Sequence, residues 1–232
     1  MIKRTLYFGN PAYLSISLDQ LVIKKPKQEN LITVPIEDIG VIVLDHQQIT
    51  ITHEVMRRLQ NNKAMLITCD NKHMPQGLLF PLEGNYTQSA IQQSQVNVSL
   101  PLKKHLWQQT IISKVRNQKR LLEKMGKSSK RLNILEKRVL TGDSSNVEAQ
   151  AAVYYWSVLF DDFKRDRYGE YPNNLLNYGY AILRSMMARA LLSSGLLPTL
   201  GIFHKNKYNA FCLADDIMEP YRPFIDQIVY SI

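Results

Sequence analysis

Residues 101–125 read PLKKHLWQQTIISKVRNQKRLLEKM, and from this stretch onward the apolar residues repeat with the 3.6-residue period of an α-helix. One side of the predicted helix carries Trp107, Ile111, Val115, Leu122 and Met125. The other side carries Arg116, Lys119, Arg120, Lys124 and Lys127. Such a helix packs its apolar side and leaves its charged side open, so we expect long helices here, one of them with an exposed basic face.

The first eighty residues follow a different pattern. Short β-branched or alternating runs are separated by turn signals such as Gly9-Asn10-Pro11 and Asp70-Asn71. The predicted strands cover residues 2–8, 13–18, 21–24, 31–34, 40–44 and 64–69, with one helix at 52–60. These runs predict a small β-rich, sandwich-like domain.

The two patterns together predict an α+β fold. We place the β-rich domain at residues 1–84 and a larger, all-helical domain at residues 101–232. Residues 85–98 carry no charge and are rich in Gln, Asn and Ser, which is typical of a connector or a polar linking helix. The linker is therefore placed at residues 85–100.

The net charge of +9 is concentrated in one segment. Residues 103–138 hold twelve Lys or Arg and two Glu, a net charge of +10, so the rest of the chain is close to neutral. Concentrated positive charge is typical of proteins that bind a polyanion, because each neutralised phosphate releases condensed counterions. Nucleic acid is the favoured partner, and an anionic membrane surface stays open as the alternative.

Composition and motifs exclude several classes of protein. No apolar run reaches the roughly 18 residues of a membrane helix, and no signal peptide begins the chain, so we expect a cytoplasmic protein without a membrane partner. Cys69 and Cys212 lie far apart, which excludes a disulfide framework and a zinc ribbon. The common motifs of nucleotide hydrolases, dehydrogenases and serine hydrolases are absent from the sequence.

Glu148 is the first candidate for a chemical role. Apolar residues follow it at helical spacing, so its carboxylate is expected on the inward face of a helix. A buried carboxylate is hydrogen-bonded, paired with a cation or bound to a metal, because an unpaired buried charge costs several kcal/mol. The alternative is a capping box, since Ser145-Asn146-Val147-Glu148 fits the S-x-x-E pattern.

Residues 201–223, GIFHKNKYNAFCLADDIMEPYRP, hold the second group of candidates. Taken singly, Asp216 and Glu219 fit the first turn of a helix, and His204 fits a structural role. Taken together, two carboxylates and an imidazole suit Mg²⁺ or Mn²⁺. Such a metal activates a hydroxyl or water for attack on a phosphodiester, which agrees with the basic segment.

At this point the motifs resemble those of a known family. The opening PLKKHLWQQTIISKVRNQ, the run NVEAQAAVYYW at 146–156, the segment at 201–223 and Ile225-Asp226 are similar to CRISPR-associated endonuclease one, the spacer-acquisition integrase, and to its type II branch. The resemblance covers essentially the whole chain. It implies that Glu148, His204 and Glu219 are the catalytic residues and the metal ligands, with Asp216 as a further ligand of Mg²⁺ or Mn²⁺.

The same resemblance implies a bacterial enzyme of antiviral defence. As a homodimer formed through the β-rich domains, it would flank a small companion acquisition subunit in a heterohexamer, with other type II CRISPR proteins as further partners. It would insert short double-stranded DNA into the CRISPR array by transesterification of a 3′-hydroxyl onto a repeat phosphate. We predict DNA contacts from Lys114, Arg116, Lys119, Arg120, Lys205 and Arg222.

Two further expectations complete this interpretation. The alternative function is a non-catalytic, basic DNA-binding scaffold subunit, in which the acids serve only as helix caps. The chain ends at Ile232, in or just after the helix that follows Glu219, whereas members of the resembled family continue. We therefore expect a shortened C-terminus.

Overall fold

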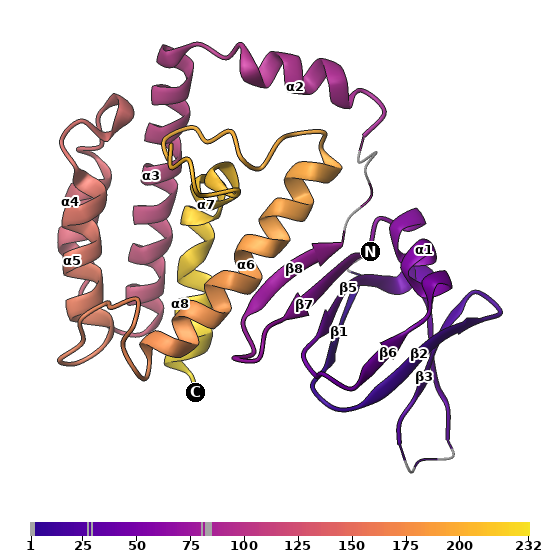
Figure 1. Cartoon of the computed structure of the whole chain (residues 1–232). Helices are drawn as coiled ribbons and strands as arrows, with labels where there is room; N and C mark the ends of the chain where they lie inside the picture. The colour runs from indigo at the N-terminus through magenta and orange to yellow at the C-terminus, as the bar shows by residue number, and fades with distance from the viewer. Residues whose placement is uncertain (1–2, 27, 29, 80, 82–84) are drawn as a thin grey trace. The chain divides into compact units, whose positions relative to one another are not determined.

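The computed structural model describes residues 3–26, 28, 30–79, 81 and 85–232. The chain divides into two compact units, Met1–Gln88 and Ser89–Ile232 (Figure 1). The division falls inside the predicted linker, where a nine-residue helix, α2 (Gln88–Val96), is found. No described helix is long and apolar enough to cross a membrane.

The N-terminal unit contains two four-stranded mixed sheets. In the first sheet β1 (Arg4–Phe8), β5 (Ile39–Leu44) and β7 (Met65–Cys69) run parallel, and β8 (Pro75–Leu79) pairs antiparallel with β7. The second sheet has the order β4 (Ile32–Pro35), β3 (Gln20–Lys24), β2 (Ala12–Ser17) and β6 (Ile49–Ile51). Helix α1 spans His53–Asn61, and the short 3₁₀ turn η1 spans Ile36–Asp38.

Both sheets and α1 share one apolar core. Leu14 and Leu21 from the second sheet, Ile42 from the first and Leu59 from α1 are fully or almost fully buried in it. The alternating pattern of β2 and β3 arises from burial of one face, whereas β5 is buried on both faces, its Val41 and Val43 packing with β7 in a second apolar cluster. Six strands and α1 were predicted within about two residues of their ends. The strands β6 and β8 were missed, because β6 has only three residues and β8 contains Pro75 and Gly77.

The second unit is helical, and with the sheets it confirms the predicted α+β class. Its helices are α2, α3 (Leu100–Lys124), α4 (Lys130–Glu136), α5 (Val147–Leu159), α6 (Asn173–Ser193), α7 (Cys212–Met218) and α8 (Arg222–Tyr230). The 3₁₀ turns η2 (Thr141–Asp143) and η3 (Glu219–Tyr221) precede α5 and α8. Helix α3 contacts α4, α5, α7 and α8, and α6 packs on α7 and α8 (Figure 1).

Helix α3 forms the axis of this unit because its buried stripe is long. Ser99 caps its first turn by accepting a hydrogen bond from the Leu102 amide, 3.4 Å away. The predicted inward residues Trp107, Ile111, Val115 and Leu122 lie in a core shared with α4 and α5, and Met125 packs against it. The helix therefore holds fixed the side chains that it directs toward α5 and η3.

Candidate active site

The site begins with a lysine on the buried stripe of α3. Lys114 is only 8% exposed, because it lies three residues after Ile111 and seven after Trp107 on the same face. Its Nζ lies 2.7 Å from Oε1 of Glu148 and 2.6 Å from Oε2 of Glu219. The ammonium thus lies between the carboxylates of two separate segments of the chain.

Glu148 lies in the first turn of α5, which is capped by a residue that sequence reasoning missed. Asp143 accepts hydrogen bonds from the amides of Val147 and Glu148, at 2.8 and 3.0 Å. Ser145 instead donates to the Arg138 carbonyl, so the capping-box alternative for Glu148 is wrong. The Glu148 side chain is 26% exposed, and its carboxylate is directed to Lys114.

His204 lies in the loop between α6 and α7, and Asp216 holds that loop. Asp216 is fully buried near the end of α7, so it is not the helix cap that the sequence suggested. Its Oδ2 accepts the amides of Ile202 and Phe203 at 2.6 and 2.9 Å. Its Oδ1 lies 2.5 Å from Nδ1 of His204. Asp216 therefore fixes both the loop backbone and the imidazole.

Aromatic packing fixes the other side of the same loop. The ring of Phe203 stacks on Trp107 of α3 with centroids 4.3 Å apart and an interplanar angle of 2°. The His204 ring meets Trp107 edge to face at 5.9 Å. Gly201 leaves room for this tight turn, since a Cβ there would lie 2.3 Å from the His204 carbonyl oxygen.

Glu219 completes the group at the start of η3, and it is held from two sides. Its residue exposure is 4%, and Arg222 Nε lies 2.9 Å from Oε1 while Lys114 approaches Oε2. Burial alone would raise the pKa of Glu219, but Lys114 and Arg222 outweigh burial and hold that pKa below its ordinary value. The carboxylate is therefore ionised at neutral pH.

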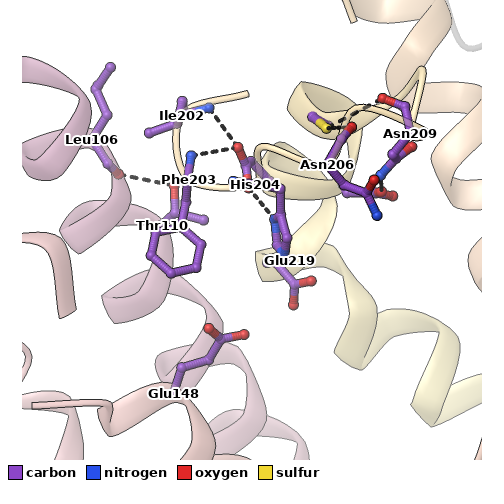
Figure 2. Close-up of polar contacts among 12 residues, drawn as sticks. Leu106, Thr110, Glu148, Ile202, Phe203, His204, Asn206, Asn209 and Glu219 are labelled. Atoms are coloured by element: carbon purple, nitrogen blue, oxygen red, sulfur yellow. Dashed lines mark hydrogen bonds and ion pairs between the residues drawn. The ribbon is translucent and has the colours of Figure 1, made fainter. Parts of the chain in front are cut away.

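The pKa of His204 lies above its ordinary value, chiefly because its ring hydrogen-bonds to Asp216, while partial burial opposes the shift. When the ring is neutral and donates from Nδ1 to this carboxylate, its Nε2 carries the free lone pair. Figure 2 shows the Glu148 carboxylate directed toward the loop that carries His204, with Glu219 beside the histidine.

Two observations bear on whether these residues fit a divalent metal: the types of ligand atom that they offer, and the surroundings of one carboxylate oxygen of Glu219. Oε2 of Glu219 is buried and lacks a well-aligned hydrogen bond, although the Lys114 ammonium is close. An oxygen of this kind and an imidazole with a free Nε2 suit Mg²⁺ or Mn²⁺. Among the described residues no three acidic, Cys or His side chains are close enough to hold an ion as they stand. The types of ligand fit, while Lys114 lies between the two carboxylates.

Comparison with known proteins identifies the family. The profile of the family described as "CRISPR associated protein Cas1" matches residues 6–232. The chain belongs to the Cas1 family. It is 39% identical, over 100% of its length and 76% of the relative's, to the CRISPR-associated endonuclease Cas1 of Neisseria meningitidis serogroup C. A Cas1 endonuclease of Pyrobaculum aerophilum is 29% identical over 85% of the chain and 72% of that protein.

Solved structures share the Cas1 fold. A casposase bound to its integration product aligns with a TM-score of 0.80 at 20% identity, over 100% of the chain and 72% of that protein. A Cas1 protein from Thermotoga maritima aligns with a TM-score of 0.76 at 16% identity, over 98% and 78%. The family expected from the motifs is confirmed, and the type II branch stays a prediction.

The predicted DNA contacts of this Cas1 chain lie in three kinds of place. Arg120 and Lys205 are exposed. Arg116 and Lys119 pair with Glu136 on α4, at 2.8 and 2.9 Å. Lys114 and Arg222 lie beside the carboxylate of Glu219, and for all six residues contact with DNA stays a prediction. The helical spacing of Lys114 from the apolar stripe was the signal in the sequence that indicated its burial.

Proposed function

We propose that this Cas1 chain is a metal-dependent DNA endonuclease and integrase of CRISPR adaptation, of the type II branch. The observation that carries the proposal is the approach of Glu148 and Glu219, 71 positions apart, to a single ammonium, with the Asp216-bound His204 beside them. Two carboxylates and an oriented imidazole suit phosphodiester chemistry with a divalent ion.

Glu148, His204 and Glu219 would hold Mg²⁺ or Mn²⁺. When bound, the ion would supply positive charge that activates a hydroxyl or water and stabilises the phosphate under attack. Asp216, with both oxygens engaged, serves better to orient His204 than to act as a ligand itself. The chain supplies the fixed positions of the ligands, because α3, α5, α7 and η3 pack into one helical unit.

The DNA is expected along exposed basic residues. Arg120 and Lys205 are free to contact phosphates, which positions a duplex without reading its sequence. In the proposed reaction the 3′-hydroxyl of a short duplex attacks a repeat phosphate, and the repeat strand leaves with a new 3′-hydroxyl. The number of phosphodiester bonds is unchanged in this transesterification.

The assembly is part of the proposal. We infer a homodimer through the β-rich unit and a heterohexamer with a small companion subunit. Support comes from relatives alone, since one structurally similar protein belongs to a complex described as Cas6-RT-Cas1–Cas2. Size-exclusion chromatography with light scattering tests this part separately.

The test is strand transfer of a 3′-hydroxyl duplex into a supercoiled plasmid that carries a repeat array, with the companion subunit present. We expect insertion with Mn²⁺, none with EDTA, and none with Glu148→Gln. The control is Glu170→Gln, an exposed glutamate outside the site, which should retain insertion. DNA binding without insertion under any divalent metal would contradict the proposal and support the scaffold alternative.

A further inference from the structure

Lys114 is the least exposed Lys or Arg among the residues that the structure describes. Desolvating an ammonium is costly, so a lysine in an apolar stripe requires compensation by negative charge. Glu148 and Glu219 supply it, at 2.7 and 2.6 Å from Nζ. The contacts of Lys114 with Glu148 and Glu219 are therefore part of the folded interior and are not an ion pair between exposed side chains.

The two contacts differ in kind. Lys114 donates a hydrogen bond to Oε1 of Glu148, whereas Oε2 of Glu219 is held by proximity of charge without a well-aligned hydrogen bond. The ammonium thus serves Glu219 mainly as a positive charge. A divalent cation would act on this oxygen in the same way, and more strongly.

Geometry places the ammonium where a bridging ion would have to lie. Nζ lies 2.7 Å from one oxygen of Glu148 and 2.6 Å from one oxygen of Glu219, so the ammonium fills the space between these two oxygens. A divalent ion held by these same two oxygens would need that space. Lys114 and the metal therefore cannot both occupy it.

Charge balance leads to the same conclusion. Lys114 contacts both carboxylates and Arg222 contacts Glu219, so the carboxylates already have basic partners without metal. Adding a divalent ion while Lys114 stays would place two cations side by side at low dielectric, where repulsion is strong. Binding of the metal requires the ammonium to leave the carboxylates.

We infer that the Lys114 ammonium is the resident counterion of the metal-free site and competes directly with a divalent metal for Glu148 and Glu219. The inference rests on the proposed metal site. Lys114 then stabilises the metal-free protein and raises the metal concentration that is needed to fill the site.

The test is isothermal titration of the full chain with MnCl₂ at pH 8, for wild type, Lys114→Met and Lys114→Arg. We expect the neutral variant to bind Mn²⁺ at least about tenfold more tightly, since nothing competes. We expect the arginine variant to bind more weakly than wild type, since a guanidinium holds two carboxylates by several hydrogen bonds. The matched control is Lys119→Met, which removes a lysine paired with Glu136 on the same helix and should leave the Mn²⁺ Kd unchanged.

Thermal unfolding supplies a second measurement. In EDTA, Lys114→Met should melt below wild type because two carboxylates lose their counterion, and saturating Mn²⁺ should raise its Tm more than that of wild type. If Lys114→Met does not fold, the arginine variant decides the question through its predicted weaker binding. An Mn²⁺ Kd that is unchanged or weaker in Lys114→Met, or tighter in Lys114→Arg, would overturn the inference.

The failure of this inference is distinguishable from failure of the proposed function. If wild type binds Mn²⁺ and Glu148→Gln abolishes binding, the metal site stands, and only the lysine variants decide the role of Lys114. If neither wild type nor Lys114→Met binds Mn²⁺, the metal site and the competition are both refuted.

Discussion

Replacing Asp216 by Asn tests how the histidine loop is held and oriented. Asp216 offers Oδ2 to the amides of Ile202 and Phe203, and Oδ1 to both the amide and Nδ1 of His204. An asparagine can keep one oxygen for the two amides, but its amino group must then face Nδ1. Nδ1 becomes an acceptor, the ring proton moves to Nε2, and the lone pair needed for a metal is lost.

The magnitude follows from these contacts. Asp216→Asn should cost about 1–3 kcal/mol in unfolding free energy, since the Ile202 and Phe203 amides keep an acceptor while the His204 amide, which Oδ1 accepts at 3.3 Å, loses its own. Asp216→Ala leaves all three part-buried amides without this acceptor, at about 1 kcal/mol or more each, so it should cost at least about 3 kcal/mol. Mn²⁺ affinity should fall about 10- to 100-fold even in the asparagine variant, as for other changes behind a metal-bound histidine.

Two assays separate loop stability from imidazole orientation. Amide hydrogen exchange should show residues 202 and 203 protected in Asp216→Asn and unprotected in Asp216→Ala, and nitrogen NMR should show the His204 proton on Nε2 in Asp216→Asn. The control is Asp215→Asn. Asp215 is the neighbour of Asp216 in the chain, but its carboxylate accepts hydrogen bonds from Arg184 and Asn209 and not from the histidine loop. A His204 ring that keeps its proton on Nδ1 in Asp216→Asn, or normal Mn²⁺ affinity there, would refute the reasoning.

Two further predictions concern residues outside the site. Burial raises the pKa of Asp226 to about 6, against an ordinary value of 3.8, although hydrogen bonds from two tyrosines oppose the shift. The unfolded chain releases this proton at lower pH than the folded chain does. The unfolding free energy should therefore fall by up to about 3 kcal/mol as the pH rises from about 4 to 6, and stay level above that. Urea unfolding at several pH values should show this fall in the wild type and not in Asp226→Asn. Asp143→Ala should lower the unfolding free energy by about 1–2 kcal/mol through loss of the α5 cap, whereas Ser145→Ala should change it by less than about 0.5 kcal/mol. A pH-independent difference between wild type and Asp226→Asn, or equal costs for Asp143→Ala and Ser145→Ala, would contradict these expectations.

The sequence predicted what periodicity controls. One-sided burial repeats every two residues in strands and every 3.6 in helices, so most strands and the inward face of α3 could be found. The strand β8 escaped this reasoning because Pro75 and Gly77 read as a turn, and tertiary pairing with β7 overrides that local preference.

The sequence supplied candidate residues for the site but not the contacts among them. Motif resemblance singled out Glu148, His204 and Glu219, whereas the contacts among them depend on which segments the fold brings together.

The cap of α5 illustrates the difficulty, because Ser145 fits the local pattern better than Asp143. The backbone at Asp143 and Asn146 has φ of 50° and 51°, and the carboxylate of Asp143, not Ser145, accepts the first amides of the helix. Lys114 was predicted to contact DNA, although its spacing places it in the apolar stripe of α3.

The most direct test of the central claim is an anomalous difference map from crystals of the full chain grown with Mn²⁺. We expect one strong peak within bonding distance of Glu148, Glu219 and Nε2 of His204, with Nζ of Lys114 moved away from both carboxylates. Absence of a peak at this place at saturating Mn²⁺, or a peak elsewhere with Lys114 still bound between the carboxylates, would contradict the account.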